Sequence, residues 1–179
     1  FKTLFPDQPK FRIKQIEKAL FDEKVNGWLE ATTLPKNIRE TLDKNVPLIH
    51  CIAAKVFQSA RKDTFKALLK TSDNHLFESV LMANKRGQWT ICVSSQIGCA
   101  MKCVFCATGT MGLKRSLIAE EISDQYRFWK TFLRGHPDVP QRISNVVFMG
   151  MGEPLANYDN VKKAINTWLA HTDLGPTRI

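Results

Sequence analysis

The sequence predicts an α/β protein in which two strand–loop–helix units follow a small N-terminal helical domain and a β-hairpin. Two short apolar runs, at 90–94 and 145–149, are each followed by a loop and then by a stretch with helical periodicity. Before them, residues 1–62 show helical periodicity, and residues 63–86 alternate like paired strands. The chain has 179 residues, 44% of them hydrophobic, which is enough for one to two small domains.

The first 62 residues are expected to form the helical domain. Apolar side chains recur at helical spacing from Lys10 to Phe21, and a second short helix is predicted from Pro35 to Leu42. A third helix is expected over Val46 to Ala54. A basic helical domain could grip structured RNA or could serve only as a scaffold, and both interpretations stay open.

Residues 63–86 are expected to form a hairpin that connects this domain to the core. The runs 64–70 and 75–82 are strand-like, and Thr71-Ser-Asp-Asn74 between them is rich in turn-forming residues. Glu78 lies in the second strand, where alternation is also compatible with a side chain that simply faces solvent.

Three cysteines lie close together in Cys99-Ala-Met-Lys-Cys103-Val-Phe-Cys106, a C-x3-C-x2-C spacing. Iron–sulfur clusters are held by thiolates at short local spacings of this kind. Three thiolates can hold three irons of a [4Fe–4S] cluster and leave the fourth iron open. An open iron suits the amine and carboxylate of S-adenosyl-L-methionine (SAM), from which a low-potential cluster can generate a 5′-deoxyadenosyl radical. The motif therefore predicts a cluster site.

Zinc binding and disulfide formation are the alternative uses of these cysteines. A structural zinc site needs a fourth ligand, and the four histidines, His50, His75, His136 and His171, are all distant from the motif in sequence. Disulfides are disfavoured because cysteines so close on a tight loop pair poorly and the total of five is odd. Since the chain opens without a hydrophobic signal segment, a reducing cytoplasm is the expected compartment.

The cysteine loop is expected to join a strand to a helix, and a second unit repeats the plan. Helices are predicted from about Leu117 to Phe132 and from Asn160 to His171. Between the second strand and its helix, Gly150-Met-Gly-Glu-Pro154 supplies small residues that let a ligand approach the backbone. A plain turn is the alternative reading, but in parallel α/β folds the loops after strands carry the active site.

Three motifs together resemble the radical-SAM dual-specificity RNA (adenine-C2)-methyltransferases. They are Cys92-Val-Ser-Ser-Gln-Ile-Gly-Cys99, the cysteine motif continued by Ala-Thr-Gly, and Val147-Phe-Met-Gly-Met-Gly-Glu-Pro-Leu155. The resemblance covers about residues 76–171 and is looser before them. It implies a partial radical-SAM (βα) barrel, represented by its first two βα units. It also implies methylation of C2 of adenine in 23S rRNA, and in tRNA, through a methyl-cysteine intermediate.

The resemblance also assigns roles to individual residues. The implied cluster ligands are Cys99, Cys103 and Cys106. The implied SAM contacts are Phe105, Gly152 and Glu153. The implied catalytic residues are Glu78 and Cys92. Phe105 would contact the adenine of SAM, and Gly152 and Glu153 its methionine or ribose end. Glu78 would accept the C2 proton. Cys92 would form a disulfide with the methyl-carrying cysteine during turnover, and a buried strand cysteine is the alternative.

The implied cofactors are a [4Fe–4S] cluster and two SAM molecules per turnover. The implied partners are 23S rRNA, tRNA and an electron donor such as flavodoxin. A net charge of +9 agrees with a polyanionic partner, and no apolar run is long enough for a membrane span. Because two βα units cannot close a barrel and Thr177–Ile179 is expected to open another strand, we expect an inactive N-terminal fragment that stops before the methyl-carrying cysteine.

Two other functions remain open. The sister methylase that acts on C8 of adenine in 23S rRNA shares these motifs. A non-enzymatic module could instead hold an iron–sulfur cluster structurally and bind RNA. A fourth cysteine ligand would favour that module, and none is suitably spaced; Cys51 is expected to be structural.

Overall fold

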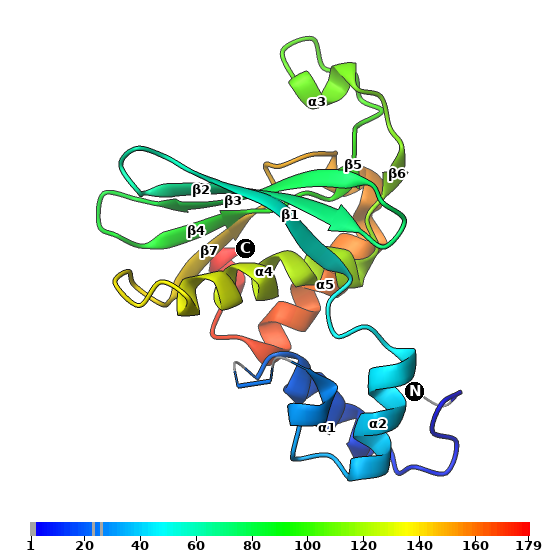
Figure 1. The fold of residues 1–179 in the computed structure, drawn as a ribbon. Coiled ribbons are helices and arrows are strands. Elements are labelled where there is room, and N and C mark those ends of the chain that lie inside the picture. Colours follow the sequence, from blue (N-terminus) through cyan, green and yellow to red (C-terminus); the bar gives the residue numbers. More distant parts are fainter. Residues whose placement is uncertain (1–2, 23, 26) are drawn as a thin grey trace. The chain divides into compact units, whose positions relative to one another are not determined.

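The computed structural model describes residues 3–22, 24–25 and 27–179, and the chain divides into two compact units, Phe1–Ile49 and His50–Ile179 (Figure 1). The stretch 51–58, which the sequence analysis placed in the helical domain 1–62, lies in the second unit.

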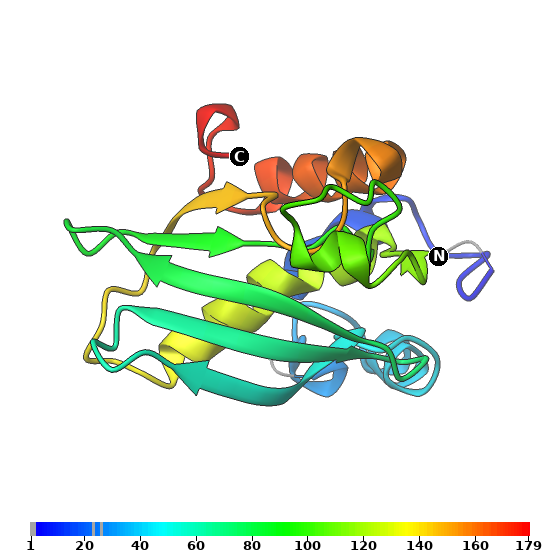
Figure 2. The ribbon, with the colours of Figure 1, turned by 90° about the horizontal axis from the view of Figure 1, so that it is seen from above.

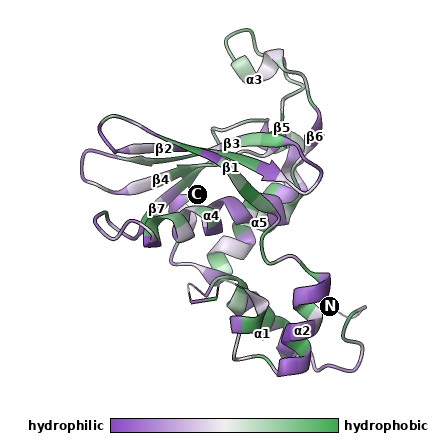
Figure 3. Cartoon of the chain, viewed as in Figure 1, coloured by the Kyte–Doolittle hydropathy of each residue, from purple (hydrophilic) through white to green (hydrophobic). Residues whose placement is uncertain are grey.

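The first unit is helical, and its core is built from one side of each helix. It contains α1 (Phe11–Leu20), the 3-10 helix η1 (Trp28–Glu30) and α2 (Lys36–Asn45), and both α-helices mix hydrophilic with hydrophobic residues (Figure 3). The buried core residues are Phe5, Ala19, Trp28, Ala31, Leu34, Ile38 and Leu42. The indole N–H of Trp28 donates to the carbonyl of Val46 at 2.7 Å, so the largest core side chain has its polar atom satisfied. Both helices lie close to the ranges expected from periodicity.

The second unit is built on a five-stranded sheet with the order β1-β2-β3-β4-β7. Its strands are β1 (Cys51–Gln58), β2 (Thr64–Thr71), β3 (Leu76–Ala83), β4 (Trp89–Cys92) and β7 (Ile143–Val147). The pair β4–β7 is parallel, and the other three pairs are antiparallel. The predicted hairpin is present as β2 and β3, and it extends the parallel pair into a mainly antiparallel mixed sheet.

Helix α4 (Ala119–Arg134) lies along one face of this sheet, and α5 (Tyr158–His171) packs beside α4 (Figures 1 and 2). The alternation in β3 shows why this face is the core, because Phe77, Ser79 and Leu81 are buried and the residues between them are less so. Trp129 of α4 is fully buried against that face, and its indole N–H donates to the Ser79 hydroxyl at 3.0 Å.

Two local predictions are wrong. No helix covers 46–54 as a whole; Cys51 instead begins β1, which pairs antiparallel with β2 because that strand offers a row of backbone partners. At the other end, Pro176–Arg178 forms a 3-10 helix, η3, where a strand was expected. The fixed φ of proline suits the start of a helical turn. The sheet has a single parallel pair among its described strands, and the partial barrel stays a prediction.

No helix among the described residues is both long enough and apolar enough to span a membrane.

Candidate functional site

The predicted cysteine loop projects from the sheet on the side away from α4 (Figures 1 and 2). Its base is a two-stranded ribbon in which β5 (Gln96–Ile97) pairs antiparallel with β6 (Arg115–Ser116). Backbone hydrogen bonds continue the ribbon on both sides. The Lys114 N–H donates to the Ile97 carbonyl at 2.8 Å, and the Leu117 N–H donates to the Ser95 carbonyl at 3.0 Å. The loop therefore leaves and re-enters the core at fixed points.

Glycine is required where the loop begins. Gly98 has φ +78°, and a Cβ built on it would lie 1.8 Å from the Gly112 carbonyl oxygen. Any side chain at position 98 would therefore combine left-handed backbone with a direct backbone clash. Close packing recurs in the loop itself, since a Cβ at Gly109 would meet the Cys103 backbone at 3.1 Å.

The three cysteines of the motif are free and differ in exposure. Cys99 at the base is buried, Cys103 is exposed and Cys106 is half-buried. Backbone N–H groups of Gly109 and Thr108 lower the pKa of the Cys106 thiol, because they stabilise its thiolate. In donor type, these three thiols on one loop fit a cluster. In the part of the chain that the structure describes, however, no three His, Cys, Asp or Glu side chains are grouped so that they could hold a metal ion.

The turn Gly150–Pro154 lies directly against the segment that leads into the cysteine loop. The Gly150 N–H donates to the Val93 carbonyl at 3.1 Å, and the Met151 carbonyl accepts from the N–H groups of Ser95 and Gln96 at 2.9 and 3.2 Å. A Cβ at Gly150 would meet the Val93 carbonyl at 2.7 Å, so the turn's first glycine permits the close approach. The two predicted ligand-binding segments are thus neighbours in space.

Ser94 and Gln125 hold this junction from inside the core. Both are fully buried, and the Gln125 amide makes two 2.8 Å hydrogen bonds to the backbone of Ser94, one to its N–H and one to its carbonyl. The Ser94 hydroxyl donates to the Glu78 carbonyl and accepts from the Met151 N–H at 2.8 Å. One serine therefore connects β3, the turn and α4.

The family resemblance implies that SAM contacts Gly152, Glu153 and Phe105. Gly152 has φ +96°, and a Cβ there would lie 2.5 Å from the Gln96 side chain. The Glu153 N–H donates to the Gln96 amide oxygen at 2.9 Å, and its carboxylate accepts from the Leu155 N–H at 3.0 Å, which caps the 3-10 helix η2 (Pro154–Asn157). Phe105 is 90% exposed at the tip of the loop.

Phe105 belongs to an exposed apolar group. Its exposed members on the cysteine loop and near the turn are Met101, Val104, Phe105, Met111, Leu113, Met149 and Leu155. Several exposed apolar side chains on one loop and the neighbouring turn are more than the isolated ones usual on a protein surface, and favour a binding role for these two segments.

Glu78 and Cys92 lie on the same face of the sheet. Val80 pairs with Cys92 across β3 and β4, and Glu78 is two residues before Val80, so all three side chains point away from α4. The half-exposed Glu78 carboxylate forms a 2.9 Å ion pair with Lys66 of β2. Burial raises the pKa of the Cys92 thiol, and a hydrogen bond from the Met149 backbone partly offsets this.

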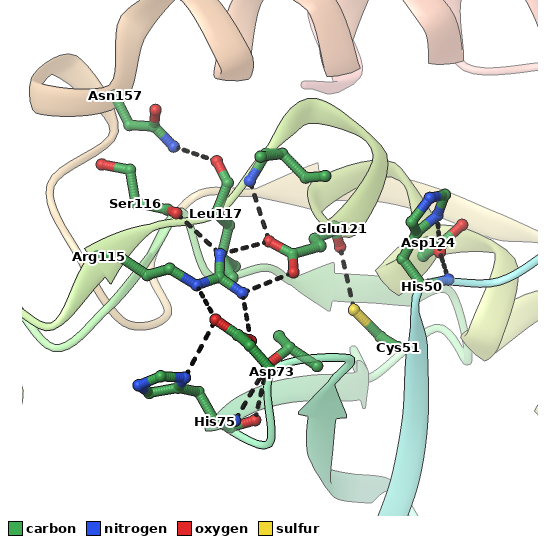
Figure 4. Close-up of polar contacts among 12 residues, drawn as sticks. His50, Cys51, Asp73, His75, Arg115, Ser116, Leu117, Glu121, Asp124 and Asn157 are labelled. Carbon is green, nitrogen blue, oxygen red and sulfur yellow. Dashed lines mark hydrogen bonds and ion pairs between the residues drawn. The ribbon is translucent and has the colours of Figure 1, made fainter. Parts of the chain in front are cut away.

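The sequence analysis missed a set of polar residues around the loop base. Arg115 contacts both Asp73 and Glu121, and Asn157 donates to the carbonyls of Ser95 and Leu117 at 2.8 Å each (Figure 4). In the sequence, the acidic residues in the first turn of α4 indicated the start of a helix but not a contact with Arg115. Because Asp73 and Arg115 are 42 residues apart, no local spacing could have joined them.

Comparison with known proteins gives relatives but no family model. The chain is 42% identical over 172 residues to a probable dual-specificity RNA methyltransferase RlmN of Aquifex aeolicus, covering 94% of the chain and 47% of that protein. It is 38% identical over 151 residues to a ribosomal RNA large subunit methyltransferase Cfr of Shouchella clausii, covering 84% of the chain and 41% of that protein. No family model matches the chain.

A solved structure agrees with these relatives. The crystal structure of a radical SAM methyltransferase from Sphaerobacter thermophilus superposes with a TM-score of 0.88 at 33% identity, covering 99% of the chain and 52% of that structure. The chain thus spans about half the length of the proteins that it matches.

Proposed function

We propose that this chain, a homologue of the RlmN and Cfr RNA methyltransferases over most of its length, supplies the cluster-binding and SAM-binding elements of a radical-SAM RNA methyltransferase. One observation carries the proposal. A loop with three free thiols is hydrogen-bonded at its base to a glycine turn, and these are the two segments for which the sequence predicts ligand binding. Neither segment alone would distinguish a binding site from an ordinary surface loop.

Cys99, Cys103 and Cys106 would hold the [4Fe–4S] cluster. The cluster, when bound, supplies the electron that cleaves SAM and produces a radical. The protein's own contribution is visible at Cys106, where two backbone N–H groups already favour the thiolate that binds iron. The fixed base holds Gln96, three residues before the first ligand Cys99, against the turn.

SAM would lie between the loop and the turn. Gly152 lets the turn pack directly against Gln96, which keeps the turn beside the start of the loop, and Phe105 presents an exposed ring suited to stacking on adenine. The Glu153 carboxylate has further acceptor capacity beyond its bond from Leu155, which suits an ammonium or a ribose hydroxyl.

Glu78 would accept the proton lost from the substrate ring, and Cys92 would resolve the crosslink between protein and RNA. Their shared face of the sheet supports a common task. The raised pKa of Cys92 keeps its sulfur protonated while it is buried, so its role requires that the thiol lose a proton or become exposed during turnover.

The substrate would be adenine in RNA, methylated at C2 in 23S rRNA and in tRNA, with an electron donor such as flavodoxin. The family resemblance of the motifs carries this assignment, and the charge of +9 suits an RNA partner. Methylation at C8 is the second candidate, because the chain is also 38% identical over 151 residues to the Cfr-named relative.

Anaerobic reconstitution tests the proposal. The chain should bind about four irons and show a SAM-dependent change in the EPR spectrum of the reduced cluster, because SAM binds an iron that has no protein ligand. Cys103→Ala should abolish both results, whereas Cys51→Ala should retain them, since Cys51 lies in β1, outside the cysteine motif. Tight binding of a single zinc ion without iron would contradict the proposal.

A further inference from the structure

The guanidinium of Arg115 lies between two carboxylates that come from separate segments (Figure 4). Toward Asp73, Nε and Nη2 donate to the two carboxylate oxygens at 2.7 and 2.8 Å. Toward Glu121, Nη1 and Nη2 donate at 2.8 and 2.7 Å. Nη1 also donates to the Ser116 carbonyl at 3.0 Å. Both carboxylate contacts are bidentate, and only the planar fork of arginine can make two such contacts at once.

The three charged groups differ in exposure, which decides how much each contact matters. The Glu121 side chain is 4% exposed, Arg115 is 28% exposed and Asp73 is 45% exposed. A buried carboxylate needs a charged partner, so the Arg115–Glu121 contact is the inner anchor. Arg115 and the Thr71 hydroxyl together hold the pKa of Asp73 well below its usual range. The Asp73 carboxyl in the outer contact is therefore ionised at neutral pH.

The two carboxylates are themselves fixed. Asp73 sits in the β2–β3 turn, where it accepts from the Thr71 hydroxyl and lies 3.2 Å from His75 Nδ1. Glu121 sits in the first turn of α4 and accepts from the Ile118 N–H at 3.0 Å. Arg115 therefore joins the return limb of the cysteine loop to a hairpin turn on one side and to a helix on the other.

The two carboxylate contacts of Arg115 bear on the cysteine loop because Arg115 lies at its base. Arg115 pairs with Ile97 in the ribbon at the loop base, and Ile97 is two residues before Cys99. A shift of Arg115 would therefore move β5, the strand that leads into the first cysteine of the motif. On the opposite side of the same limb, Asn157 already holds Leu117.

We propose that Arg115 is a positioning residue for the cysteine loop. Through Asp73, the β2–β3 turn helps to fix Arg115 and thereby the positions of the loop's thiols. The inference rests on the proposed function only in assigning a cluster to those thiols. The bridge itself can be measured in the chain without any cofactor.

Hydrogen exchange in the cofactor-free chain is the first test. Arg115→Lys keeps the charge and loses the fork, and Asp73→Asn keeps the shape and loses the charge. Each should speed amide exchange at Lys114 and Leu117, whose N–H groups close the loop base, by about tenfold. Lys114→Gln, a change of charge at the neighbouring exposed residue, should leave exchange at Leu117 unchanged. Unchanged exchange in both bridge variants would overturn the proposal.

The second test separates positioning from plain stability. Leu133→Ala removes a fully buried side chain at the far end of α4 and should lower the melting temperature without altering the SAM-dependent EPR spectrum. Arg115→Lys should retain iron but change that spectrum, because the ligands are held differently. A wild-type spectrum in Arg115→Lys would reduce the bridge to a stabilising contact and overturn the positioning role. If the wild-type chain takes up no iron, the proposed function fails, and the exchange test still decides the bridge.

Discussion

The base and the tip of the cysteine loop are held in different ways. At the base, the ribbon β5–β6, the turn Gly150–Pro154 and the buried amide of Gln125 make a dense set of hydrogen bonds to the chain at 93–97. At the tip, Val104 and Phe105 face solvent and Cys103 is exposed. The chain's own contacts therefore fix where the loop starts and ends, and the exposed side chains at the tip contribute little to that framework.

The largest expected effect comes from breaking the base. Gly98→Ala would combine a left-handed backbone with a Cβ 1.8 Å from the Gly112 oxygen, and should lower the unfolding free energy by about 3–5 kcal/mol. Denaturant titration followed by tryptophan fluorescence measures the loss.

Gly87→Ala is the matched control for this substitution. Gly87 has a similar φ of +73° and nothing within 4 Å of its built Cβ, so alanine there should cost only about 1 kcal/mol. Equal losses at positions 87 and 98 would show that backbone strain alone, and not the closure of the loop base, limits the substitution.

A smaller effect on stability is expected from His50, which directly precedes β1 and contacts Asp124 of α4. Asp124 is the chain neighbour of Gln125, whose amide holds the base of the loop. The Asp124 carboxylate raises the pKa of His50, although burial opposes it. A pKa raised by folding stabilises the protein fully below the unfolded value of about 6.5, and the stabilisation is lost as pH rises through the higher folded value.

The slope of stability against pH above 6.5 measures this contribution, which should amount to about 1 kcal/mol or less because the histidine is partly exposed. His50→Gln should keep the backbone N–H that donates to Asp124 and remove the pH dependence. A variant that retains the same slope would assign the pH dependence to another group.

The smallest effect on stability is expected at the tip. Phe105→Ala should change the unfolding free energy by less than about 0.5 kcal/mol, because the ring is 90% exposed. Its effect should instead appear in SAM binding to the reconstituted protein, with affinity reduced about tenfold by loss of the stacking surface. Val104→Ala, at a fully exposed neighbour, is the control. A large loss of stability in Phe105→Ala would mean that the tip is packed, and the contrast with the base would fail.

The sequence predicted the local elements of the core because their signals are local. The strand-like runs around the turn 71–74 and the order of charges along the α4 segment, acidic early and basic late, each depend on neighbours in the chain, and the structure has β2, β3 and α4 at those places. The spacing of Cys99, Cys103 and Cys106 and the glycines of the turn likewise predicted two ligand-binding segments from local patterns alone, and their ligands stay a prediction.

The rest depends on contacts between distant parts of the chain. Alanines and aliphatic residues at 46–54 suit a helix, but the free edge of β2 draws 51–58 into a strand, and tertiary pairing overrides propensity. The bridge through Arg115 joins residues 42 apart, and neither Asp73 in a turn nor Arg115 beside Lys114 differs in pattern from ordinary surface residues. Roles for Glu78, Cys92, Glu153 and Phe105 stay predictions, because they concern partners that only a loaded enzyme would reveal.

The junction at Ser94 also limits how related sequences can diverge. A Cβ at Gly150 would lie 2.7 Å from the Ser94 hydroxyl, while that hydroxyl serves both the Glu78 carbonyl and the Met151 N–H. A larger residue at 150 would also meet the Val93 carbonyl at 2.7 Å, so no substitution at 94 can make room for it. Losing the serine, in turn, leaves two backbone groups without their hydroxyl partner. Related sequences should accordingly keep glycine at 150 because of the Val93 backbone and serine at 94 because of its two hydrogen bonds, each for its own reason.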